Sequence, residues 1–141
     1  MIQERNNFKM GTVEMLLLSL LSQKDLYGYE ISLLLKDLSS GAFVVPEGSL
    51  YPTLYKLEDK KYITSNAVKT GKRRVQKYYH IEDAGKERLK QLLQDYRLIA
   101  NSIDIILNTD ISQFEENRTN ADEKRDKKIF ERDQASSSCF Q

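Results

Sequence analysis

Residues 46–58, PEGSLYPTLYKLE, decide the fold, because they combine helix-starting residues with a regular apolar stripe. Leucines recur at intervals of four and three residues, the spacing that places side chains on one face of a helix. These leucines are Leu50, Leu54 and Leu57. We expect a helix that begins near Gly48 and Ser49, where the serine can cap free amide groups and Pro52 falls in or near the first turn.

The opposite side of this helix is polar and carries Ser49, Thr53, Lys56 and Lys60 at spacings that keep them on one surface. Tyr51 and Tyr55 flank that surface. Packing is the simplest role for most tyrosines of the chain, since an aromatic ring with a polar tip suits the margin of a small core. Tyr51 is the exception, because its hydroxyl stands at the start of the helix and can meet a phosphate.

Two further helices and a short extended piece are predicted before this segment. The first spans about residues 10–22, with an apolar stripe of Val13, Leu16, Leu17, Leu20 and Leu21. The second runs from about Tyr27 until Ser39-Ser40-Gly41 stops it, with Ile31, Leu34, Leu35 and Leu38 as its stripe. Residues 44–46 read as extended.

A two-stranded hairpin is predicted after the third helix. Residues 62–68 and 75–81 are rich in β-branched and aromatic types, with a turn signal at Thr70-Gly71. No acidic residue lies between Asp59 and Glu82, and the interval contains Lys60, Lys61, Lys69, Lys72, Arg73, Arg74 and Lys77. The net charge of the chain is only +1, so this hairpin concentrates a positive field that the average conceals.

A long helix over residues 83–108 is predicted next. Its apolar positions alternate three and four apart, which is typical of a helix that packs lengthwise on another long helix. They are Leu89, Leu92, Tyr96, Ile99, Ile103 and Ile106. The chain offers no second helix of that kind. We therefore expect a homodimer whose interface contains Leu92, Tyr96, Ile99, Ile103 and Ile106.

The remaining residues, 109–141, form a charged tail. Residues 115–128 contain no large apolar side chain, so we expect this tail to be disordered, with at best a marginal helix. The sequence thus divides into an N-terminal domain over 1–82, a dimerisation helix over 83–108 and the tail.

Composition excludes several classes of function. The chain has 141 residues, 40% hydrophobic and 30% charged, as expected for one soluble domain with appendages. The apolar run 15–21 is too short to cross a bilayer and does not resemble a signal peptide, so we expect a cytoplasmic protein without membrane contact. One cysteine and one histidine cannot build a metal cluster, and no glycine-rich phosphate loop is present. We expect neither an enzyme nor a cofactor.

The order of elements is that of a winged helix-turn-helix, mainly α with a small β-hairpin. Such a fold inserts a helix into the major groove of duplex DNA, while wing cations reach the phosphates. The expected DNA contacts are Ser49, Tyr51, Thr53, Lys56, Lys72, Arg73, Arg74 and Lys77. The alternative is a winged helix that binds an acidic protein and no DNA.

Three motifs in order resemble the PadR family of bacterial transcriptional regulators over about residues 10–108. They are LYGYEI at 26–31, PEGSLYPTLYKLE at 46–58, and GKRR at 71–74 leading to Tyr78-Tyr79. The resemblance implies a winged helix with a dimerising C-terminal helix, and a sequence-specific regulator, most simply a repressor. It also implies a possible small aromatic effector, because Tyr96 matches an aromatic position that stacks on drugs in some PadR-like proteins. The chain departs from the family at EDAG, residues 82–85, where a threonine-led turn is usual.

Overall fold

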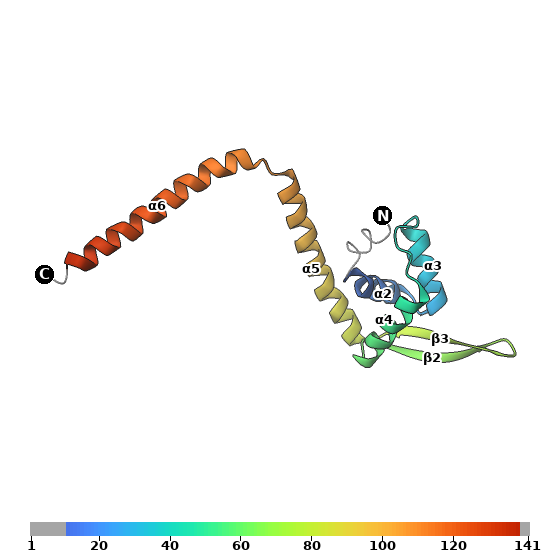
Figure 1. Ribbon diagram of the computed structural model, residues 1–141. Coiled ribbons are helices and arrows are strands. Elements are labelled where there is room, and N and C mark those ends of the chain that lie inside the picture. Colours follow the sequence, from blue (N-terminus) through green and yellow to red (C-terminus); the bar gives the residue numbers. More distant parts are fainter. Residues whose placement is uncertain (1–10, 139–141) are drawn as a thin grey trace. The chain divides into compact units, whose positions relative to one another are not determined.

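The computed structural model describes the backbone of residues 11–138 and the side chains of residues 11–112 and 121–132. The chain forms two units, Met1–Leu98 and Ile99–Gln141. The described part of the first unit begins with α2 (Thr12–Gln23), β1 (Leu26–Tyr27), α3 (Gly28–Leu38) and α4 (Glu47–Asp59). The hairpin of β2 (Ile63–Thr70) and β3 (Arg74–Ile81) follows, and α5 (Asp83–Asn108) then begins (Figure 1). The predicted fold, mainly helical with a β-hairpin, is therefore confirmed.

The sheet has three strands, whereas the sequence predicted only the two-stranded hairpin. Its order is β1-β3-β2, with both pairings antiparallel. The missed strand β1 pairs Leu26 with Tyr79 and is two residues long, too short for an alternating pattern to be visible. The hairpin itself pairs from Ile63–Ile81 out to Thr70–Arg74 and turns through residues 71–73, where Gly71 has a φ of 82°. We call residues 63–81 the wing.

The core lies between the three helices and the base of the sheet. The predicted buried side of α4 is confirmed, since Leu50, Leu54 and Leu57 are at most 1% exposed. The stripe predicted for α2 is partly wrong, because Leu18 and Met15 are buried while Leu16 and Leu20 are only partly covered. A helix that is apolar on nearly every side does not reveal from sequence which face is innermost. On α3, Leu38 is 72% exposed instead of buried.

The start of α4 differs from the predicted serine cap. Pro46 is the N-cap residue, and its carbonyl accepts the amides of Ser49 and Leu50, both at 2.9 Å. Pro52 consequently lies inside the helix and offers no N–H to the carbonyl of Gly48. The helix begins earlier than expected because Pro46 presets an extended backbone immediately before it.

The first turns of α5 are fixed on the N-terminal unit. Leu89 is 9% exposed, and Leu92 and Leu93 pack against the core. Arg88 Nε donates to Glu14 Oε1 of α2 at 3.2 Å. Gly85 is buried so closely that an added Cβ would lie 2.2 Å from the carbonyl oxygen of Tyr62.

The second unit contains the rest of α5 and helix α6 (Ile111–Ser138). The structure gives residues 111–138 a helical backbone, whereas the sequence predicted a largely disordered tail. Residues 111–138 contain no proline or glycine and many good helix formers, so the helical backbone is locally favourable. Its described apolar side chains, Ile111, Ile129 and Phe130, are exposed. The division of the chain at residues 82 and 108 stays a prediction.

No helix in residues 11–138 is both long enough and apolar enough to cross a membrane.

Candidate nucleic-acid interface

The outward surface of α4 is formed by a row of exposed residues. These are Gly48, Ser49, Pro52, Tyr55, Lys56, Asp59 and Lys60. Ser49 and Lys56 are therefore accessible, as the sequence predicted. Thr53 is half-buried, and its hydroxyl donates to the Ser49 carbonyl at 2.9 Å. Thr53 thus lies on the flank of this surface, with its hydroxyl already bonded to the helix backbone.

One flank of α4 borders the first helix. Thr53, Lys56 and Lys60 line a hollow of about 200 Å³ together with Val13 and Glu14 of α2. The carboxylate of Glu14 is bonded to Arg88, so it is partly neutralised beside these two lysines. This flank therefore keeps a net positive character.

The other flank of α4 borders α3 and the wing. Tyr51 packs over Gly28, where an added Cβ would lie 3.0 Å from its hydroxyl oxygen. Tyr51 also lines a hollow of about 180 Å³ with Tyr27, Gln76 and Lys77. Tyr51 is therefore part of the junction between α3, α4 and the wing, and its expected phosphate contact stays a prediction.

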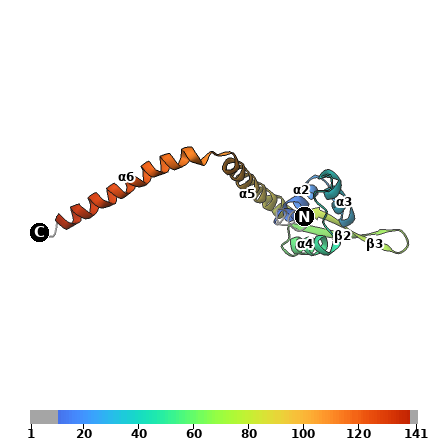
Figure 2. The ribbon, with the colours of Figure 1, turned by 45° about the horizontal axis from the view of Figure 1, so that its top comes forward.

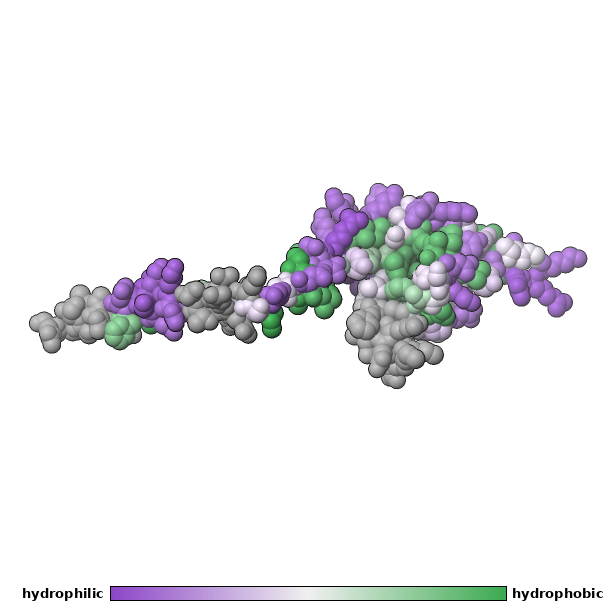
Figure 3. Space-filling view, turned by 90° about the horizontal axis from the view of Figure 1, so that it is seen from above, coloured by the Kyte–Doolittle hydropathy of each residue, from purple (hydrophilic) through white to green (hydrophobic). Residues whose placement is uncertain are grey.

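The wing projects away from α2, α3 and α4 in both ribbon views (Figures 1 and 2). Lys72 and Arg73 lie in its terminal loop, Arg74 and Lys77 lie on β3, and all four are exposed. The space-filling view shows the far end of the wing as strongly hydrophilic (Figure 3). Among the described residues, Lys72, Arg73 and Arg74 have no acidic partner. The cations at the tip are therefore available for an anionic ligand.

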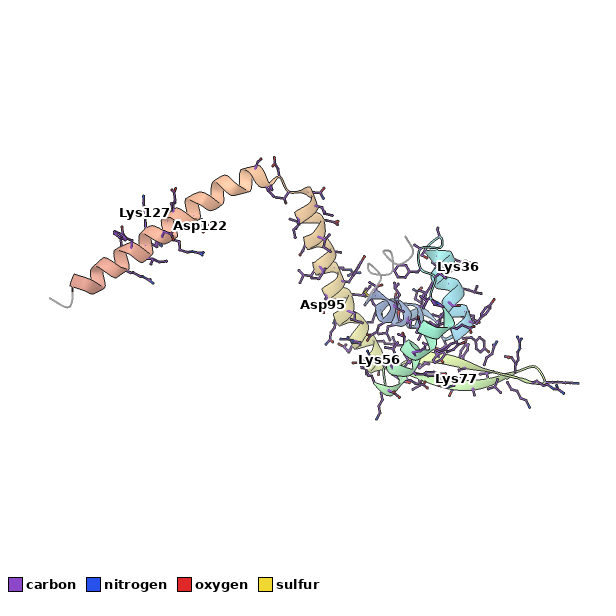
Figure 4. All side chains as sticks on the ribbon, viewed as in Figure 1. Lys36, Lys56, Lys77, Asp95, Asp122 and Lys127 are labelled. Atoms are coloured by element: carbon purple, nitrogen blue, oxygen red, sulfur yellow. The ribbon has the colours of Figure 1, made fainter. Side chains whose placement is uncertain are left out.

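Besides the shared apolar core, two side-chain contacts between described residues join α4 to the wing, and the sequence predicted neither. Ser65 Oγ of β2 donates to Glu58 Oε1 of α4. The ammonium of Lys77 lies 5.2 Å from the centroid of the Tyr55 ring. Figure 4 labels Lys77 on the wing and Lys56 on α4. Tyr55 was not among the predicted site residues, although its position next to Lys56 on the outer side of the helix was a signal.

The buried end of this junction contains Tyr79. Burial, followed by the charge of Glu58, raises the pKa of Tyr79 to about 12. Its hydroxyl has no hydrogen-bond partner among the described residues. Tyr27 and Tyr78 meet edge to face with ring centroids 4.6 Å apart, as expected for packing tyrosines, but Tyr29 is 60% exposed.

The single histidine, His80, lies on the surface of the sheet. Its Nδ1 is 2.7 Å from Asp25 Oδ1, and about half of its side chain is exposed. The described residues contain no group of three or more histidine, cysteine or acidic side chains that could hold a metal ion.

The C-terminal part of α5 exposes apolar side chains along the predicted dimer seam. Tyr96, Ile99, Ile103 and Ile106 are 50%, 58%, 50% and 71% exposed, whereas Leu92 is partly covered by the core. Leu98, Ile105 and Leu107 add exposed apolar surface outside that seam. Figure 3 shows hydrophobic atoms on this part of the helix. Neighbouring exposed apolar side chains of this kind are typical of an interaction surface.

Comparisons with known proteins agree with this architecture. The family described as "Transcriptional regulator PadR-like family" matches residues 17–91, which include α4 and the whole wing. An uncharacterised protein of Lysinibacillus sphaericus is 31% identical over 105 residues, which cover 73% of this chain and 94% of that protein. The transcriptional regulator YqjI of Escherichia coli is 31% identical over 68 residues, 48% of this chain and 33% of that one.

Solved structures show the same fold. A PadR-like transcriptional regulator from Bacillus cereus is 31% identical with a TM-score of 0.63, covering 74% of this chain and 99% of that one. Bacillus subtilis PadR, solved in complex with operator DNA, is 30% identical with a TM-score of 0.56, covering 60% of this chain and 46% of that one. The family match spans more than half of the sequence and both elements of the interface, and the chain belongs to the PadR-like family of transcriptional regulators.

Proposed function

We propose that this chain binds duplex DNA as a homodimer and represses transcription by occupying promoter sequence. In this proposal α4 enters the major groove, with Ser49, Thr53 and Lys56 near base edges and Tyr51 near a phosphate. The wing residues Lys72, Arg73 and Arg74 contact the sugar-phosphate backbone, and Lys77 lies further in on the wing.

One observation carries the proposal: a wing free of acidic residues lies beside the exposed surface of α4. A helix of this size fits the major groove, and a ribbon with unpaired cations at its tip can reach phosphates next to it. The relative from Bacillus subtilis was solved on operator DNA, which supports the same use of the shared fold here.

The exposed apolar surface of α5 supports the homodimer. A two-fold dimer presents two copies of α4, and such proteins bind paired half-sites about one helical turn of DNA apart. An operator with two-fold symmetry is therefore expected. A dimer that covers such a site competes with RNA polymerase when the site overlaps a promoter.

The test uses the full chain and measures anisotropy of labelled duplexes, both unrelated duplexes at low salt and fragments selected from the source genome. The double variant Arg73→Ala/Arg74→Ala should bind both kinds of duplex more weakly. The control Lys124→Ala/Lys127→Ala removes the same charge from α6 and should bind like the parent. A parent chain that binds no duplex at low salt would instead support the protein-interaction alternative.

An effector site at Tyr96 is a separate part of the proposal. The ring is half exposed on α5, so in a dimer it could stack on a planar aromatic compound. Titration of such compounds should quench tyrosine fluorescence and weaken DNA binding in the parent, and Tyr96→Leu should abolish both responses. Packing in the dimer seam is the simpler role, and it stands if the parent shows neither response.

A further inference from the structure

The wing and α4 run alongside each other and are joined at two levels. The inner level is the hydrogen bond from Ser65 to Glu58, and Ser65 is paired with Tyr79 across the sheet. Two residues further out, Lys77 is paired with Ala67, and its ammonium lies 5.2 Å from the Tyr55 ring. Ala67 is too small to reach α4. The contact between Lys77 and Tyr55 therefore joins the two elements at this outer level.

Beyond this level the wing has little to pack on. Val68 is 38% exposed and Val75 is 66% exposed, although both have side chains that would be buried in a larger sheet. Figures 1 and 2 show the outer ribbon extending away from α2, α3 and α4. A two-stranded ribbon is marginally stable by itself, so its direction depends on the contacts at its base.

The Tyr55 ring is itself held in place. Its centroid is 6.4 Å from that of Tyr51, and Tyr51 packs over Gly28 at the start of α3. Tyr55 is 47% exposed, so part of the residue meets its neighbours and part remains open to solvent. A cation over such a ring is attracted by the negative charge of the aromatic face.

We propose that Tyr55 is a positioning residue: its contact with Lys77 sets the direction of the wing relative to α4. The cations at the wing tip then meet phosphates while α4 is seated in the groove. This proposal rests on the proposed function only for its consequence in DNA binding, because the contact itself belongs to the free protein. It assigns to Lys77 a role different from the direct phosphate contact expected from sequence.

The first experiment measures hydrogen exchange in the free full chain. Tyr55→Leu and Lys77→Gln should both accelerate exchange of the wing amides beyond the Ala67–Lys77 pair, while Tyr55→Phe keeps the ring face and should match the parent. Lys69→Gln is the matched control, because it removes an exposed wing cation that has no aromatic partner among the described residues. Unchanged exchange in both Tyr55→Leu and Lys77→Gln would overturn the proposal.

The second experiment measures DNA affinity of the same variants. Tyr55→Leu and Lys77→Gln should each weaken binding by about two- to fivefold per subunit, and the double variant should be no weaker than either single one. Lys69→Gln combined with Tyr55→Leu should instead be additive. Loss of affinity in Lys77→Gln without any loss in Tyr55→Leu would make Lys77 a direct phosphate ligand and refute the positioning role.

The two experiments separate this proposal from the proposed function. If the parent binds no DNA, the proposed function fails, and the exchange measurement still decides whether Tyr55 and Lys77 hold the wing.

Discussion

At the scale of single residues, two helical glycines occupy opposite surroundings. An added Cβ at Gly85 would lie 2.2 Å from the Tyr62 carbonyl oxygen and 2.8 Å from Ile81 Cγ1. At Gly48 it would meet nothing within 4 Å. Gly85 is therefore required for the close docking of α5, whereas Gly48 only weakens α4.

These surroundings give a pair of stability predictions. Gly85→Ala should lower the free energy of unfolding by about 1–3 kcal/mol, because backbone must move to admit the methyl group. Gly48→Ala should raise it by about 0.5–1 kcal/mol, because alanine loses less conformational freedom in a helix. Urea unfolding of the full chain measures both values. Equal stability of the Gly85→Ala variant and the parent would contradict the close docking at Tyr62.

Tyr79 gives a prediction at alkaline pH. Its pKa is raised from the ordinary value of 10.0 to about 12, mainly by burial and then by Glu58. The unfolded chain releases the proton first, so the stability from the neutral hydroxyl is complete below pH 10.0 and declines as the pH rises toward about 12. Tyr79→Phe should show a shallower alkaline decline than the parent in unfolding experiments between these pH values.

The control for this prediction is Tyr29→Phe, which removes a hydroxyl from an exposed ring. That variant should retain the parent's full decline. If Tyr79→Phe and Tyr29→Phe have the same pH profile, burial of Tyr79 does not cause the pH dependence.

Residue roles on α4 were only partly predictable. The leucine stripe identified the buried side correctly, because four- and three-residue spacing reports helix geometry directly. It could not show that Thr53 bonds its own helix, nor that Tyr51 packs on Gly28, because both depend on rotamers and on neighbouring elements. Tyr55 was missed for the same reason, since its partner Lys77 lies on the wing.

At the scale of elements, the proposed function divides the work between α4 and the wing. Cations on flexible stems mainly meet phosphate and give affinity without much sequence information. Arg73→Ala/Arg74→Ala should therefore weaken specific and unrelated duplexes alike, and lower the salt slope by about one unit for each phosphate that is no longer neutralised in each subunit. Ser49→Ala/Lys56→Ala should instead change which sequence is preferred, because each good hydrogen bond to a base edge contributes about 1–3 kcal/mol of discrimination.

Competition titrations at several salt concentrations measure both effects. Wing variants that alter sequence preference, together with α4 variants that leave it untouched, would reverse this assignment.

Elements were predictable where local pattern determines them. Helices α3, α4 and α5 and the hairpin have clear periodicity or turn signals, and the structure places them within a few residues of the predicted bounds. Strand β1 was missed because it forms only by pairing with β3, whose residues lie far along the chain. A strand of two residues has no sequence pattern from which that pairing could be predicted. The innermost face of α2 was misjudged because several elements surround that helix.

At the scale of the whole molecule, composition identified the charge-rich tail but did not predict that its backbone is helical. Residues 111–138 form helix α6 although their described apolar side chains are exposed. Burial of apolar side chains dominates the stability of packed elements. Because residues 115–128 have no large apolar side chain to bury, the sequence suggested disorder. Local helix preference acts without burial, which is why composition alone did not decide between a helix and an irregular chain.

The last prediction concerns assembly and compares α5, which contains the proposed dimer seam, with α6. Ile103 is half exposed on α5 and lies within the proposed dimer seam, so Ile103→Asp should leave the folded protomer intact but place an unpaired carboxylate between two copies. Burying that charge costs several kcal/mol, enough to shift a dimer toward monomer at micromolar concentration. Asn101→Asp adds the same charge to an exposed polar position of α5 and should stay dimeric.

Truncation after Thr109 removes α6 and should also leave the dimer, because the removed segment exposes rather than packs its described apolar residues. Sedimentation velocity over a range of concentrations distinguishes these cases. A dimer that persists in Ile103→Asp would place the interface elsewhere, and a truncated chain that becomes monomeric would transfer it to α6. Because two copies of α4 are needed to read a symmetric operator, Ile103→Asp should also lose affinity for paired half-sites while retaining weak binding to unrelated DNA.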